Sequence, residues 1–205
     1  MTKEKYIEDL SEIRSIMDRS SRFISLSGLS GVIAGFLALT GAYMAYRTVY
    51  IGQDYFSYRR ATLTGESATQ LLLIASSVLL LSLAGGILLT RSKAKRDGLS
   101  LWDQQSKRLV INLAIPLVAG GVLCLILLGK GFVALIAPLT LLFYGLALIN
   151  ASKYTLSEIR GLGIAEITLG LVACQFIGYG LLFWSIGFGV LHIVYGILMH
   201  YRYGS

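Results

Sequence analysis

Two ionisable residues lie inside the last apolar stretch of the chain, between Gly161 and Arg202. Glu166 precedes and His192 follows the turn-like segment 178–180, and each lies thirteen positions from Tyr179. If the flanking runs form an antiparallel helix pair, the carboxyl and the imidazole lie at the same depth. An ionisable group inside a bilayer is costly and normally faces a partner or a cavity. The spacing therefore predicts a Glu166–His192 contact.

The residue types of this pair are suited to proton transfer, because histidine changes its charge near physiological pH and a carboxyl group can exchange a proton with it. The same contact could instead be a structural bridge that fixes the register of the two helices. The sequence leaves both interpretations open.

Both residues share a helix face with small residues, which allow another helix to approach closely. The first apolar run has a similar stripe, which we expect either to pack inside the protein or to form a homo-oligomer contact. The predicted helix-packing positions are Ser27, Gly31, Gly35, Gly163, Gly170, Ser185, Gly189 and Gly196.

Two prolines predict kinks, at Pro116 and Pro138. A helical proline leaves the carbonyl four residues earlier without its amide partner, and for Pro116 that carbonyl belongs to Asn112. Either the side chain of Asn112 lines a polar cavity, or it belongs to a bend whose polar groups are satisfied within the same helix.

The chain has 205 residues, of which 55% are hydrophobic and 14% are charged, a composition typical of an integral membrane protein. Its apolar runs approach the roughly 20 residues that span a bilayer. We expect an all-α fold with six transmembrane helices as three hairpins, in a single domain over 21–205. The predicted spans are 23–46, 68–90, 108–129, 132–151, 162–177 and 181–200.

An amphipathic helix is expected within residues 1–20. Tyr6, Leu10, Ile13 and Met17 form an apolar stripe, and charged residues cover the other face. Such a helix over 3–19 suits the membrane surface, a cytoplasmic protein partner or packing on the protein's own loops.

The distribution of cations predicts the topology. If both termini are cytoplasmic, fourteen of the eighteen Lys and Arg residues lie on the inner side and four on the outer side. This bias fits the positive-inside rule. We therefore expect a multi-pass protein of a bacterial inner membrane, with the lipid bilayer and not nucleic acid as the partner of its charge.

Four segments together resemble a family of six-span bacterial inner-membrane proteins to which no activity is assigned. They are SRFISLSGLSG at 21–31, SKRLVINLAIPL at 106–117, YGLALINASKYTL at 144–156 and GFGVLHIVYGI at 187–197. The resemblance implies the membrane location but supplies no catalytic or binding residue.

The segment Gly28-Leu29-Ser30-Gly31 resembles the GxSG motif of rhomboid intramembrane proteases, and Ser30 would lie at a depth similar to that of His192. A serine–histidine pair is the minimum for nucleophilic activation. The motif lies in the first span here, whereas that family carries it in the fourth.

Phosphate-binding loops, HExxH sequences and Cys/His clusters are missing from the sequence, so we expect no cofactor and no metal. The leading expectation is a small-solute or proton-linked transporter or channel with Glu166, His192 and Asn112 at its polar site. The alternative is a non-catalytic interaction or sensory protein that acts through residues 3–19 and the small-residue faces. A third and more remote hypothesis is an intramembrane serine protease. We do not expect the protein to be an enzyme.

Overall fold

A computed structural model describes residues 27–50, 65–96, 98 and 102–203, and within these ranges it is helical and contains no strand. The predicted amphipathic helix lies outside the described residues. The helices are α2 (Gly28–Tyr50), α3 (Gly65–Arg96), α4 (Gln104–Gly129), η2 (Val133–Leu135), α5 (Ile136–Ala151), η3 (Ser152–Tyr154), α6 (Glu158–Gln175), α7 (Gly180–Trp184), the π-helix η4 (Ser185–Leu191) and α8 (His192–Tyr203).

Five helical stretches in the described chain are long and apolar enough to cross a membrane, which indicates a membrane protein. They correspond to α2, α3, α4, the segment from η2 to η3, and the segment from α7 to α8. The helix outside this set is α6, which has 18 residues and carries Glu158, Arg160 and Glu166.

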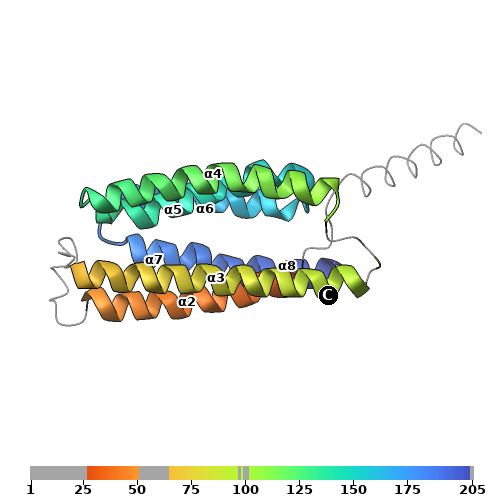
Figure 1. Ribbon diagram of the computed structural model, residues 1–205, viewed down its shortest axis with the longest axis horizontal. Coiled ribbons are helices and arrows are strands. Elements are labelled where there is room, and N and C mark those ends of the chain that lie inside the picture. Colours follow the sequence, from red (N-terminus) through yellow and green to blue (C-terminus); the bar gives the residue numbers. More distant parts are fainter. Residues whose placement is uncertain (1–26, 51–64, 97, 99–101, 204–205) are drawn as a thin grey trace, which may run out of the picture.

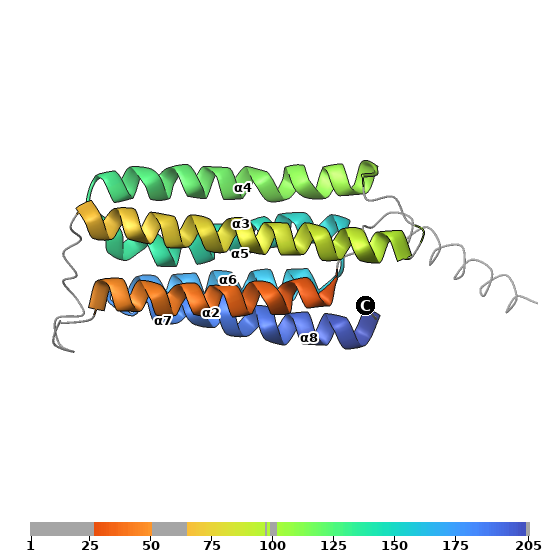
Figure 2. The ribbon, with the colours of Figure 1, turned by 60° about the horizontal axis from the view of Figure 1, so that its bottom comes forward.

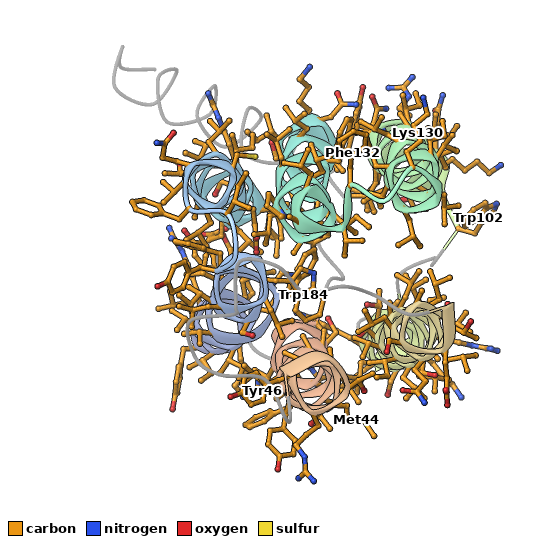
Figure 3. All side chains as sticks on the ribbon, turned by 90° about the vertical axis from the view of Figure 1, so that its left-hand side faces the viewer. Met44, Tyr46, Trp102, Lys130, Phe132 and Trp184 are labelled. Carbon is orange, nitrogen blue, oxygen red and sulfur yellow. The ribbon has the colours of Figure 1, made fainter. Side chains whose placement is uncertain are left out.

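The helices lie side by side in two rows (Figure 1). In one row α5 packs against α4 and α6, and in the other α2 packs against α3 and α8. The end-on view shows the rows facing each other (Figure 3). The start of α2 and the end of α8 lie at the same end of the molecule (Figure 2).

Helix ends are set by local signals. Asp103 caps α4 through a reciprocal capping box with Ser106. Gly131 and Gly178 have φ of 81° and 104°, so the turns after α4 and α6 use a backbone conformation that favours glycine.

Glycine faces join the helices within each row. A Cβ placed on Gly35 would lie 2.6 Å from the carbonyl oxygen of Gly189, and one on Gly196 would lie 2.7 Å from the amide nitrogen of Val32. On the other row, a Cβ on Gly145 would lie 2.6 Å from the carbonyl oxygen of Gly163. Because nothing larger than hydrogen fits, these backbones are in direct contact.

These contacts show which partner each small-residue face takes. Gly31 and Gly35 face α8 and the π-helix, so the stripe on α2 is used inside the chain. Gly163 and Gly170 face α5, because Cβ atoms there would meet Gly145 and Pro138. The last two apolar runs thus pack chiefly against α5 and α2, and not against each other as a simple hairpin would.

The two prolines lie within α4 and α5. Asn150 of α5 donates its side-chain amide to the Asn112 carbonyl at 2.9 Å, so the acceptor four residues before Pro116 is satisfied by the neighbouring helix. Pro138 lies in the first turn of α5, where a missing amide hydrogen costs little.

Candidate functional site

Glu166 is the most buried ionisable residue of the described chain, with no exposed surface. It projects from α6 toward the other row and lies against Gly187 of the π-helix, where a Cβ would collide with Oε2. Neither of its carboxyl oxygens has a hydrogen-bond partner among the described residues. The glycine at 187 therefore makes room for the carboxyl group of Glu166.

His192 lies next to this carboxyl group, at the C-terminal end of the π-helix. Its Nδ1 is 3.6 Å from Oε1 of Glu166 and 3.0 Å from the carbonyl oxygen of Gly187. Since a carbonyl oxygen accepts only, we infer that Nδ1 carries the hydrogen that it donates to Gly187.

The other ring nitrogen of His192 has a partner from the opposite row. Nε2 is 2.8 Å from the hydroxyl oxygen of Tyr144 on α5. With the hydrogen on Nδ1, a neutral ring accepts the tyrosine hydrogen at Nε2, whereas a protonated ring would donate to the hydroxyl oxygen. Tyr144 can serve both states because a hydroxyl group donates and accepts.

The π-helix brings these groups together. Its wider turn accompanies a contact between the His192 ring and the Gly187 carbonyl five residues earlier. Single π-turns inside helices often occur at functional sites. Here the π-turn places the Gly187 carbonyl against the imidazole of His192, and the imidazole lies against the carboxyl group of Glu166 from the other row.

The electrostatics of this cluster favour a bound proton. An isolated carboxylate in a dry interior is strongly unfavourable, so its charge has to be balanced. The proton can reside on Glu166 itself, or on His192 as the positive partner of an ionised carboxylate. The arrangement is thus a buried pair with two possible positions for one proton.

Aromatic rings connect the cluster to a cavity. The centroids of Trp184 and Phe188 are 4.9 Å apart, and Phe188 lies 4.8 Å from Tyr144 and 5.7 Å from His192. Trp184 lines a cavity of about 450 Å³ between the rows. Glu166 is not part of that lining, so the aromatic series ends the cavity before the carboxyl group.

A second polar contact joins the rows at the end where α2 begins and α8 stops. The Tyr203 hydroxyl lies 2.9 Å from both carboxyl oxygens of Glu158, and Nη1 of Arg202 lies 2.7 Å from Oε1. These contacts hold the start of α6 against the end of α8.

The sequence-based site is thus brought together in part. Glu166 and His192 are in contact, whereas the side chain of Asn112 donates to the Arg108 carbonyl of its own helix. Tyr144 and Gly187 were not singled out from the sequence. A tyrosine hydroxyl inside an apolar run is a signal that would have identified Tyr144, but no sequence signal marks the Gly187 carbonyl.

The serine of the GxSG-like segment makes a different bond from the one that proteolysis needs. The Ser30 hydroxyl donates to the Ser27 carbonyl, and both ring nitrogens of His192 face other groups. A nucleophile–base contact is therefore not formed in this structure. Among the described residues, no three His, Cys, Asp or Glu side chains cluster as a metal site.

Comparisons of the chain with protein-family models, with curated proteins and with solved structures find no match.

Proposed function

We propose that the protein is a proton-linked membrane transporter in which Glu166 and His192 carry the coupling proton. One observation supports this most: between the two rows of helices lies a fully buried carboxyl group that has no hydrogen-bond donor among the described residues. Intramembrane acids that face the interior of a helix bundle commonly belong to proton or ion pathways.

The proposal includes a sixth span over residues 162–177, most of which α6 forms. Five of the described helical segments are long and apolar enough to cross a membrane, and α6 packs along α5, which belongs to one of them. The bias of Lys and Arg favours cytoplasmic termini in a bacterial inner membrane. In that orientation the Glu158–Tyr203 contact is at the inner end and the cavity is toward the outer end.

Transport would use motion of one row against the other. The rows separate around a cavity at one end and are joined by polar contacts at the other. Rocking of two packed bodies about a central site is a common way to alternate access. Glu166 would bind a proton when the outer path opens and release it when the inner path opens.

The interaction alternative has less support from the described residues. One of its surfaces, residues 3–19, lies outside them. The other, the stripe with Gly31 and Gly35, packs against α8 in the same chain.

The test is proton flux in liposomes that contain the purified protein and a pH-sensitive dye, after a potassium diffusion potential is imposed. Wild-type protein should acidify or alkalinise the lumen, and Glu166→Gln should reduce the rate to that of protein-free liposomes. Glu66→Gln is the matched control, because Glu66 is exposed in the first turn of α3. Wild-type flux in Glu166→Gln would overturn the proposal.

A further inference from the structure

The cavity of about 450 Å³ is lined by residue types that elsewhere in this protein pack tightly. Its walls include Gly41, Ala42, Ala45, Ala68, Ala75 and Ala137 from α2, α3 and α5. On the faces of Gly35 and Gly145, small residues bring backbones into contact. Around the cavity Gly41 still packs closely on the side chain of Val78, but the lining as a whole borders open space. Protein interiors are normally close-packed, and a space of this size lies in the range of small-molecule sites.

The chemistry of the lining specifies the ligand. Among the described residues that line the cavity there is no charged side chain, and most are Ala, Leu, Ile, Val or Gly. The Thr140 hydroxyl already donates to the Ala137 carbonyl at 2.8 Å. A charged or strongly polar ligand would lose its hydration without gaining partners. Charge complementarity therefore selects a neutral, apolar molecule.

The shape and position of the cavity fit a ligand that arrives from the bilayer. Lining residues on α3 extend from Ala68 to Val78, which corresponds to about 15 Å along a helix. Leu72 on this wall is 42% exposed, so the wall continues into the apolar outer surface. Figure 3 shows Trp184 between the two rows at this end.

We propose that this cavity is the substrate site and that the substrate is a neutral lipophilic small molecule free in the membrane. This assignment rests on the proposed transport function. The rings of Trp184 and Phe188 join the site to His192, so a ligand that displaces Trp184 changes the packing of the imidazole. Substrate and proton sites are thereby adjacent but separate.

Fluorescence of Trp184 offers a direct test. The chain has two tryptophans, and Trp102 is exposed, so Trp102→Phe leaves Trp184 as the single reporter. The full-length variant is placed in lipid nanodiscs and titrated with 1-bromododecane, whose bromine quenches tryptophan on contact. We expect quenching that saturates. Ala75→Phe, which fills the cavity, should abolish the saturable phase, and the neighbouring Ser76→Phe, outside the lining, should retain it.

The outcomes separate the possible occupants. Quenching that rises linearly and is equal in Ala75→Phe and Ser76→Phe would overturn the proposal. A second outcome would also overturn it. If nanodiscs made of brominated phosphatidylcholine already quench Trp184 fully and 1-bromododecane adds no further quenching, a bilayer lipid chain occupies the site. Since binding is measured without a pH gradient, loss of quenching with intact proton flux refutes only the substrate site. Intact quenching without flux refutes only the transport function.

Discussion

The contacts inside each row of helices differ in kind from the contacts between the rows. Inside the rows, α2 packs on α8 and α5 on α6 through glycines whose backbones touch. Between the rows, the polar contacts come from a few side chains: Glu166 with His192, Tyr144 with His192, and Glu158 with Tyr203 and Arg202. The rows are joined to each other through side chains, which include the buried apolar cluster of Leu148, Ile159, Leu162 and Met199.

This difference indicates where relative motion of the helices costs the least free energy. Helices whose backbones touch have no free space between them, because a small displacement produces either steric overlap or a void. The pair of Glu158 and Arg202, in which the arginine side chain is 69% exposed, can be exchanged for water at small net cost. A protein built in this way can open along the junction between the rows while each row remains intact.

The largest effect is expected from a bulky residue inside a row. Gly196→Leu would force a side chain into the backbone of α2 at Val32, so we expect a loss of about 3 kcal/mol in stability, at the upper end for overpacked sites. Thermal unfolding in detergent measures it. Gly86→Leu on α3 is the control, because a Cβ there meets nothing within 4 Å. Equal melting temperatures for the two variants would mean that the glycine contact does not hold the row.

A change at the junction should have a smaller effect and the opposite sign. Glu166→Met replaces a buried carboxyl group, which has no hydrogen-bond donor among the described residues, by an apolar side chain of similar size. A neutral His192 keeps its contacts with Gly187 and Tyr144, so we expect stability to rise by about 1–2 kcal/mol. The same thermal assay tests it, and proton flux should be absent. Clear destabilisation by Glu166→Met would show that the carboxyl group is a structural bridge.

Much of this arrangement follows from the pattern of residues. The apolar runs predict the long helices, since length and hydropathy alone decide whether a segment suits a bilayer. The equal spacing of Glu166 and His192 from Tyr179 predicts a common depth, because both helices rise by the same amount per residue. The structure places their side-chain atoms 3.6 Å apart.

The choice of helix partners could not be predicted in the same way. A stripe such as Gly163 and Gly170 says that some helix approaches closely, but not which one. The structure pairs that stripe with α5, and pairs Gly196 with α2. The π-helix before His192 has no sequence signature either, so the sequence does not predict the contact between His192 and the Gly187 carbonyl. The hydrogen bond from Asn150 to the Asn112 carbonyl could not be predicted either, because it depends on which helix lies beside α4.

The smallest effect is expected at the inner end, where Glu158 precedes the proposed span of α6. Burial acts to raise the pKa of this carboxyl group, but hydrogen bonds from its own amide, from Tyr203 and from Ser157, together with the charge of Arg202, lower it below its ordinary value of 4.5. A lowered pKa in the folded state means that the ionised form stabilises the contact. That stabilisation is complete above about pH 4.5 and is lost as the pH falls through the folded-state value.

Tyr203→Phe removes one donor from Glu158 and leaves Arg202 in place, so we expect a loss of about 1 kcal/mol or less and a weaker dependence of stability on acid pH. Melting temperatures recorded from neutral to acid pH provide the measurement. Tyr201→Phe is the control, because Tyr201 is 84% exposed. An unchanged pH dependence in Tyr203→Phe would assign the contact to Arg202 alone. If Tyr203→Phe also speeds proton flux while Tyr201→Phe does not, the Glu158 contact resists opening of the inner end, as expected for a junction that moves between two rigid rows.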